Sequence, residues 1–223
     1  MNILIIGEKV SASELRKKIP EEFNVDHRIL VNDSILGKYD LIFDLQFDEK
    51  EDNLQYYAPM QDKVIFVGAV RKQLAQIQKD FHGEIQCKLI GMNTLPTFMD
   101  RPVLEFSLLE KEDEDILKKL AAKLNWNYCL VEDRVGMVTP RVLFMIINEA
   151  CFTLQEGTAS IADIDKGMKL GTGYPMGPLE WSDKIGIEQV YTTLSRLYED
   201  TADERYKICP LLKSYYLKNK SFY

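Results

Sequence analysis

The segment Gly7–Ala12 is the first place in the sequence where residue types and spacing point to a chemical role. A glycine between an apolar strand and a helix is typical of the turn that holds the phosphates of a dinucleotide, for which the complete fingerprint is G-x-G-x-x-G. Gly7 supplies the tight turn and Ala12 is small enough for the third position, but Lys9 occupies the second, where a side chain obstructs the pyrophosphate. Glu8 would also repel a phosphate. These residues favour a Rossmann-like strand and helix without a nucleotide over an intact dinucleotide site.

An acidic residue at the end of the second strand of such a unit holds the ribose hydroxyls of the cofactor. Asp33 is the candidate for this role. The triplet Asn32-Asp33-Ser34 is equally consistent with a turn and a helix cap, because these short polar side chains hydrogen-bond to neighbouring backbone groups. Both interpretations of Asp33 stay open at this point.

We expect no metal site. The sequence has two histidines, His27 and His82, and its four cysteines are scattered without C-x-x-C spacing. Each cysteine lies in an apolar or helical stretch, which is typical of reduced, buried thiols. The cysteine pattern therefore predicts a cytoplasmic protein.

The charge balance excludes other classes of partner. With 35 acidic and 28 basic side chains the net charge is -7, whereas a nucleic-acid-binding surface needs clustered Lys and Arg. No apolar run approaches the roughly 18 residues expected of a membrane span. The apolar N-terminal run has no basic residues before it, so we interpret it as a strand and not as a signal peptide. We expect neither nucleic acid nor membrane as a partner.

Short apolar runs alternate with helical patterns over the first 134 residues. Strands that are apolar on both faces and are separated by helices indicate a parallel sheet covered on two sides. The acidic run 110–115 is interpreted as the solvated first turn of a helix, where carboxylates complement the helix dipole. The expected strands are 2–7, 27–31, 39–45, 63–67, 88–92, 103–107 and 128–131, and the expected helices are 11–19, 71–81 and 112–124.

The pattern changes near residue 135, after which only helical periodicity is found. Helices are expected at 141–154, 161–170, 187–200 and 203–217, with a turn at 171–178. We therefore predict an α/β Rossmann-like domain over residues 1–134, followed by an all-α domain over residues 135–223.

The most specific pattern of the sequence lies in this second half. Val135–Ala150 reads VGMVTPRVLFMIINEA, Glu156–Gly171 reads EGTASIADIDKGMKLG, and Tyr174–Glu180 reads YPMGPLE. These segments are similar to the helical domain of 3-hydroxyacyl-CoA dehydrogenases, particularly the bacterial 3-hydroxybutyryl-CoA type. The resemblance extends from Gly136 to about Tyr223 with almost no gaps. Its prolines, glycines and aspartates set turns and helix starts, so these motifs identify the family without performing its reaction.

The resemblance also implies a catalytic pair in the first domain. Family members carry a G-x-H-F-F-N-P segment at a strand end, and a Glu twelve positions after the His completes a His–carboxylate dyad. Here the segment reads GMNTLP from Gly91, so Asn93 falls on the His, and Glu105 falls on the Glu. A neutral His accepts the 3-hydroxyl proton while hydride leaves C3, whereas an amide cannot accept it. Two roles are open for Asn93: it caps the end of the strand, or it donates a hydrogen bond to a ligand carbonyl.

Other functional segments of the family are also altered. The family's V-N-R at the start of the long helix, with a substrate-binding Asn, is Thr139-Pro140-Arg141 here. The family's N-T-S-S corresponds to Gly68–Arg71, and residues 32–38 leave no room for the helical excursion that contacts CoA. Arg141 is retained, as a substrate-binding residue or as a structural anchor. His82 lies in a turn ahead of the strand, and Asp100 or Lys72 are the alternatives for a replacement base.

Two hypotheses follow from the resemblance. In the first, the chain is a 3-hydroxyacyl-CoA dehydrogenase-like protein of 3-hydroxybutyryl-CoA metabolism, with NAD as the family's cofactor and with impaired or lost activity. In the second, it is a noncatalytic dimeric paralogue that binds an acyl-CoA-type or nucleotide ligand, or a partner enzyme. Both hypotheses imply a homodimer formed through the helical domain.

Overall fold

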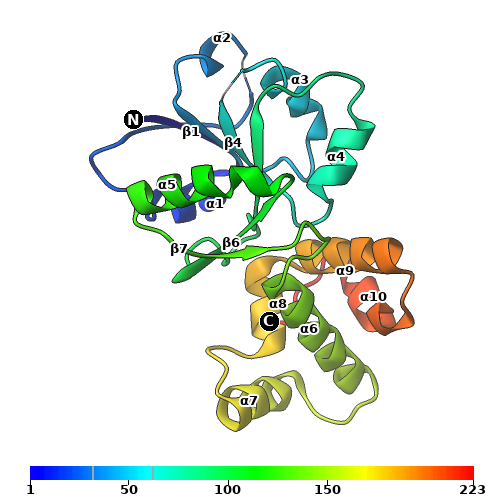
Figure 1. The fold of residues 1–223 in the computed structure, drawn as a ribbon. Helices are drawn as coiled ribbons and strands as arrows, with labels where there is room; N and C mark the ends of the chain where they lie inside the picture. Colours follow the sequence, from blue (N-terminus) through cyan, green and yellow to red (C-terminus); the bar gives the residue numbers. More distant parts are fainter. Residues whose placement is uncertain (32, 62) are drawn as a thin grey trace. The chain divides into compact units, whose positions relative to one another are not determined.

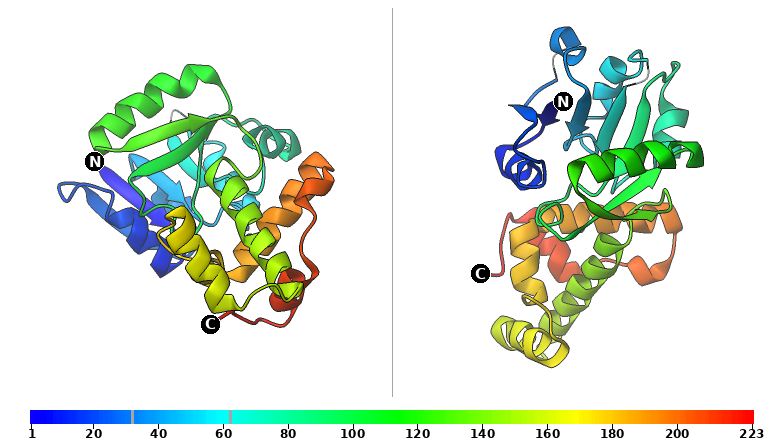
Figure 2. Two further views of the ribbon diagram at one scale, coloured as in Figure 1. Left: turned by 90° about the horizontal axis from the view of Figure 1, so that it is seen from below. Right: turned by 60° about the vertical axis from the view of Figure 1, so that its left-hand side comes forward.

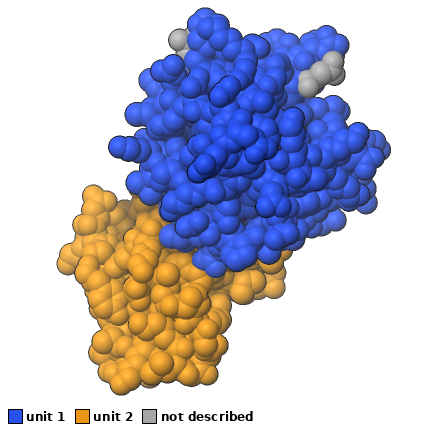
Figure 3. Space-filling model, turned by 90° about the vertical axis from the view of Figure 1, so that its left-hand side faces the viewer, with its two compact units in different colours: residues 1–137 blue, residues 138–223 orange. Residues whose placement is uncertain are grey.

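The computed structural model describes residues 1–31, 33–61 and 63–223, which divide into two compact units, 1–137 and 138–223 (Figure 3). Every strand in the described part of the chain belongs to the first unit, and the second is built from helices (Figure 1). This is the predicted fold class, an α/β Rossmann-like part followed by an all-α part. Among the helices that the structure describes, none combines the length and apolar composition needed to span a bilayer.

The first unit contains a seven-stranded sheet with the order β2-β1-β3-β4-β5-β6-β7. The first five strands in chain order pair in parallel, β6 runs antiparallel to β5, and β7 runs parallel to β6. The expectation of a parallel sheet is therefore wrong at β6. Residues 93–102 join β5 to β6 without a helix, and a parallel crossover needs a dozen or more residues. The strands are β1 (Asn2–Ile6), β2 (Asn24–Arg28), β3 (Leu41–Asp44), β4 (Val64–Gly68), β5 (Lys88–Met92), β6 (Val103–Leu108) and β7 (Asn127–Val131).

Aromatic side chains form the centre of the core on one face of this sheet. The rings of Phe43 and Phe66 stack with centroids 4.8 Å apart, and Phe106 meets the Phe66 ring edge-on at 5.4 Å. Trp126 stacks on Phe106 at 5.7 Å, and its indole N–H donates to the carbonyl of Lys18. Helices α1 (Lys9–Arg16) and α5 (Glu114–Leu124) bury apolar residues in the same cluster.

Strand residues on the opposite face are buried as well. Along each strand they alternate with the residues that point into the aromatic cluster. These buried residues are Leu4, Ile6, Ile42, Ile65, Val67 and Leu89. Helices α3 (Leu54–Tyr57) and α4 (Leu74–Asp80) also bury apolar side chains outside that cluster. The short connecting elements are α2 (Asp33–Leu36), η1 (Glu51–Asn53) and η2 (Lys111–Asp113). Burial of both sheet faces explains why these strands lack polar alternation in sequence.

Several predicted boundaries are wrong for local reasons. The first helix begins at Lys9, capped by extended Glu8 and not by Ser11. The second strand ends at Arg28, and the residues taken for its end, Ile29 and Leu30, are 54% and 68% exposed. The acidic run 110–115 is not wholly solvated, because Asp113 is buried and pairs with Lys88 at 3.0 Å.

The helical unit contains α6 (Thr139–Gln155), α7 (Ile161–Thr172), α8 (Pro178–Ile185), α9 (Ile187–Thr201), η3 (Glu204–Tyr206) and α10 (Pro210–Leu217). The sequence pattern did not predict α8, which begins directly after the expected turn. The helix expected at 203–217 is broken, because Pro210 cannot continue a helix and instead opens α10. In Figure 1 and in the right-hand view of Figure 2, α7 lies at one end of this unit, beside the C-terminal part of α6.

The carboxylate of Asp165 joins two of the family-like motifs. It is almost fully buried and accepts hydrogen bonds from the backbone N–H groups of Leu179 and Glu180, both at 2.8 Å. These are N–H groups of the first turn of α8, which have no partner within the helix. A Cβ added at Gly177 would lie 2.1 Å from the Asp165 carboxyl carbon. The D-I-D and P-M-G-P-L motifs are therefore one helix-capping arrangement, in which glycine makes room for the capping carboxylate.

We predict that Gly177→Ala destabilises the protein by about 1–3 kcal/mol, the range typical of overpacking. Gly177 has φ -70° and ψ 153°, which alanine adopts readily, so the cost is steric and not conformational. Chemical denaturation followed by circular dichroism measures the change.

Gly171→Ala is the matched control, since a Cβ at this α7 position meets nothing within 4 Å. Alanine there is expected to be neutral or to stabilise the helix by about 0.5–1 kcal/mol. Equal stability of the two variants would show that Asp165 does not need the space at Gly177.

Candidate functional site

The carboxyl ends of the parallel strands form the edge of the sheet at which ligands of open α/β folds bind. The chain crosses from β1 to β2 on one side and to β3 on the other, so the reversal of strand order lies between β1 and β3. At this edge β1 leads into Gly7 and β3 ends at Asp44. Both are positions where a ligand of such a sheet would be expected.

Gly7 lies directly after β1, and Lys9 and Ala12 lie on α1, the helix that follows. The Gly7 N–H donates to the carbonyl of Arg28 at 2.9 Å, and the Gly7 carbonyl lies 2.7 Å from the His27 Nε2 atom. Lys9 is exposed at the first helical position, and Ala12 is buried in the core. Their role toward a cofactor stays a prediction.

Asp33, the candidate ribose-binding residue, opens the short helix α2. Its side chain lies outside the described part of the structure. The two interpretations of this side chain, as a helix cap and as a ribose partner, therefore stay predictions.

Asn93 and Glu105 are neighbours across the antiparallel pair of β5 and β6. The register pairs Met92 with Phe106, so the next step along both strands places Asn93 opposite Glu105. The Asn93 Nδ2 atom donates to the Glu105 Oε2 atom at 3.0 Å, and the Asn93 backbone N–H donates to the Glu105 carbonyl at 3.1 Å. Both residues are buried, at 4% and 6% exposed. The twelve-residue spacing read from the sequence is thus a cross-strand contact.

The amide of Asn93 is engaged at both ends. Its Nδ2 holds the carboxylate of Glu105, and its Oδ1 accepts from the backbone N–H of Leu95 at 3.3 Å. The second contact is the strand-end capping that was one of the two predicted roles of this residue. Because a neutral amide has no basic nitrogen, Asn93 cannot act as the proton acceptor that the resemblance places at this position.

The loop that follows Asn93 is held by Glu14 of α1 and by Lys18, which follows this helix. The Glu14 carboxylate accepts the Thr97 N–H at 3.1 and 3.2 Å, and Lys18 Nζ donates to the Arg101 carbonyl at 2.7 Å. Thr97 has φ +72°, a left-handed conformation that is unusual for a β-branched residue. Burial raises the pKa of the Glu14 carboxyl. The loop is therefore held in one conformation by contacts that the sequence did not suggest.

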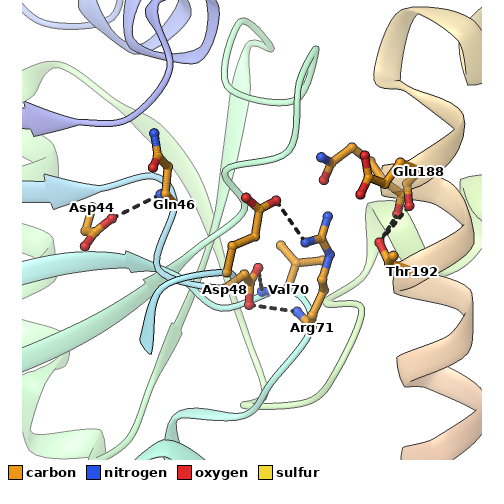
Figure 4. A network of polar contacts seen from close by, with 9 residues as sticks. Asp44, Gln46, Asp48, Val70, Arg71, Glu188 and Thr192 are labelled. Carbon is orange, nitrogen blue, oxygen red and sulfur yellow. Dashed lines mark hydrogen bonds and ion pairs between the residues drawn. The ribbon is translucent and has the colours of Figure 1, made fainter. Parts of the chain in front are cut away.

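Two aspartates at the end of β3 were missed by sequence reasoning (Figure 4). Asp44 is fully buried and accepts from Asn53 Nδ2 at 2.7 Å, from the Tyr57 hydroxyl at 2.8 Å and from the Gln46 N–H at 3.1 Å. Burial raises the pKa of Asp44, and its hydrogen bonds act in the opposite direction. An aspartate directly after three apolar strand residues was the available signal for this site.

Asp48 follows in the loop after β3. Its carboxylate accepts the Val70 N–H at 2.9 Å and the Arg71 N–H at 3.1 Å, as Figure 4 shows. The Arg71 guanidinium in turn pairs with Glu49 at 3.2 Å. The loops after β3 and β4 are therefore tied together by charged groups at the carboxyl edge.

The remaining candidates have partners of their own. Arg141 donates to the Tyr206 hydroxyl at 2.9 Å, a contact within the helical unit. Lys72 pairs with Glu51 and, at 2.9 Å, with Asp80. Asp100, on the exposed surface, lies 3.7 Å from the ammonium group of Lys17.

The family described as 3-hydroxyacyl-CoA dehydrogenase, C-terminal domain, matches residues 136–221. The 3-hydroxybutyryl-CoA dehydrogenase of Bradyrhizobium diazoefficiens is 42% identical over 98 residues, covering 44% of this chain and 33% of the relative. A probable 3-hydroxybutyryl-CoA dehydrogenase of Bacillus subtilis is 36% identical over 131 residues, covering 57% and 46% of the two chains. The chain thus aligns with less than half the length of these relatives.

Solved structures of related dehydrogenases have the same fold as this chain. The (S)-3-hydroxybutyryl-CoA dehydrogenase of Ralstonia eutropha superimposes with a TM-score of 0.76 at 17% identity, over 100% of this chain and 98% of that one. FadB2 of M. tuberculosis superimposes with a TM-score of 0.80 at 15% identity, over 99% and 97% of the two chains. The helical half, residues 136–221, therefore matches the C-terminal domain of the 3-hydroxyacyl-CoA dehydrogenase family, and the chain as a whole has the fold of these dehydrogenases.

Proposed function

We propose that the chain is a 3-hydroxyacyl-CoA dehydrogenase-like protein that has lost the dehydrogenation step and acts as a noncatalytic homodimer. The observation that carries this proposal is the Asn93–Glu105 hydrogen bond, because the family resemblance places a His–carboxylate dyad at these two positions. The acid and its cross-strand geometry are retained, and the group that would exchange the proton is replaced.

The chemistry explains why this one replacement is severe. Oxidation of a 3-hydroxyl requires a base for the hydroxyl proton while hydride leaves C3 for the nicotinamide of NAD. Loss of a positioned base commonly costs on the order of 10² to 10⁴ in rate. Of the suggested substitutes, Lys72 is held between two carboxylates, and Asp100 is an exposed carboxylate beside an ammonium group. These contacts favour loss of activity over replacement of the base.

We predict no turnover of acetoacetyl-CoA with NADH above a buffer blank, measured by the absorbance of NADH at saturating concentrations of both. The Bacillus subtilis relative, assayed under the same conditions, serves as the positive control. The matched variant is Asn93→Ala, which removes the amide and is expected to leave the blank rate unchanged.

Saturable NADH oxidation by the wild-type protein would overturn the proposal. A drop of that rate in Glu105→Gln would further identify the buried carboxylate as part of a working site. Glu105→Gln keeps an acceptor for the Asn93 amide, so it separates loss of charge from loss of the hydrogen bond.

The homodimer is supported by the surface of the helical unit. A cavity of about 380 Å³ lies between α6 and α7, with a mainly apolar lining that includes Ile146, Ala150, Ile164 and Met168. Helix α7 buries few of its own side chains, and its Leu170 is 77% exposed. An apolar hollow beside a protruding amphipathic helix is typical of a surface that a partner covers. We propose that a second copy of the chain covers this α6–α7 groove.

We predict that Met168→Glu converts the dimer into a monomer, because it places a charge in the groove that a partner must desolvate. Size-exclusion chromatography with light scattering measures the molar mass. Leu217→Glu is the control, because it adds the same charge at an exposed apolar position on α10 outside the groove lining. A wild-type monomer, or dissociation by both variants alike, would contradict this assignment.

A further inference from the structure

The family's cofactor can be tested against the turn after β1. In the dinucleotide fingerprint the first glycine is needed for a tight turn close to the ligand. Here Gly7 has φ +154°, and a Cβ added to it would lie 3.0 Å from Leu45 Cβ and 3.5 Å from Leu45 Cγ and Cδ1. The space left by the missing side chain is therefore filled by Leu45. Packing against this leucine is a sufficient reason for glycine at position 7.

Leu45 belongs to a well-fixed segment, residues 45–50, which we call the 45–50 loop. The Leu45 backbone N–H donates to the Ile6 carbonyl at 2.8 Å, which extends the pairing of β3 with β1 up to the turn. The side chain is 8% exposed and forms part of the main hydrophobic cluster, and that of Phe47 is fully buried. Withdrawal of the loop would return these apolar groups to water.

Polar contacts fix the other end of the 45–50 loop. Asp48 accepts the two N–H groups of Val70 and Arg71 (Figure 4), and Lys50 N–H donates back to the Gln46 carbonyl at 3.0 Å. In this loop the backbone N–H groups of Leu45, Gln46, Glu49 and Lys50 thus donate to acceptors of the chain itself. The loop covers the edge where the strand order reverses, which is where a dinucleotide lies in open α/β folds.

The charge at the start of α1 also disfavours a bound phosphate. Glu8, which is exposed, is the N-cap residue, and the structure gives it no side-chain cap hydrogen bond. Its carboxylate lies where a helix N-terminus would attract a phosphate, and like charges repel there. Exposed Lys9 follows it at the position of the second fingerprint glycine. The residues present therefore do not fit a bound pyrophosphate.

We propose that the 45–50 loop occupies the dinucleotide crevice of this chain and that Leu45 is the residue that excludes NAD from the β1 turn. This inference concerns the cofactor site and is independent of the lost proton-transfer group. Binding of NAD without turnover would overturn it and leave the proposed function intact, whereas turnover would overturn the proposed function.

The test is isothermal titration of NAD and NADH into four proteins. They are the wild type, a double variant with Glu8→Ala and Lys9→Gly, a triple variant that adds Leu45→Ala, and a control that instead adds Leu41→Ala. The control removes the same side-chain atoms from the other end of β3. Circular dichroism and thermal melting establish that each variant is folded.

Saturable binding is expected only in the triple variant, with an affinity at least tenfold above that of the double variant and of the Leu41→Ala control. Wild-type binding overturns the proposal, as does a double variant that binds as tightly as the triple. Absence of binding in a folded triple variant also overturns it, since Leu45 is then not the excluding residue. If the triple variant does not fold, Leu45→Val in the double background replaces it, and an affinity equal to that of the double variant overturns the proposal.

Discussion

The stacked aromatic core is the interaction on which the first unit depends. The rings of Phe43, Phe66 and Phe106 come from β3, β4 and β6, and Trp126 closes the stack just before β7. The cluster therefore bridges the parallel strands and the antiparallel pair that follows them. Because large rings fill fixed volumes in a close-packed interior, they hold the relative positions of the strands that carry the carboxyl-edge residues.

Aspartate carboxylates fix loops and helix starts in both units. Asp48, Asp133 and Asp165 each accept two consecutive backbone N–H groups, at 70–71, 74–75 and 179–180 respectively. Ionised carboxylates in such positions act as strong acceptors for N–H groups that no helix or strand satisfies. These three acidic residues therefore have an architectural role in the chain.

The sequence predicted what depends on local pattern. Apolar runs located six of the strands in the described sheet, whereas the run expected for the second strand overlaps β2 only at His27 and Arg28. The pairing of Asn93 with Glu105 was implied by the family resemblance, which places the two members of the dyad at these positions. The sequence did not predict α8, because Pro178 and Gly177 read as a turn when the Asp165 cap is unknown. It did not locate Asp44 or the 45–50 loop either, since their roles arise from contacts with residues distant in sequence. Gly7 was interpreted through a fingerprint, although a side chain placed at this position would meet Leu45 first.

The arrangement of Asp165 and Gly177 has an evolutionary consequence. The two residues are coupled, since a larger side chain at 177 or a shorter one at 165 each breaks the same cap. Selection for folding alone is then sufficient to preserve both motifs, with or without the family's reaction. Sequence identity in the helical half, 136–221, is therefore explained by the common scaffold, without reference to catalysis. The sequence differences that bear on the family's reaction are those at the carboxyl edge of the sheet, at Lys9 and Asn93.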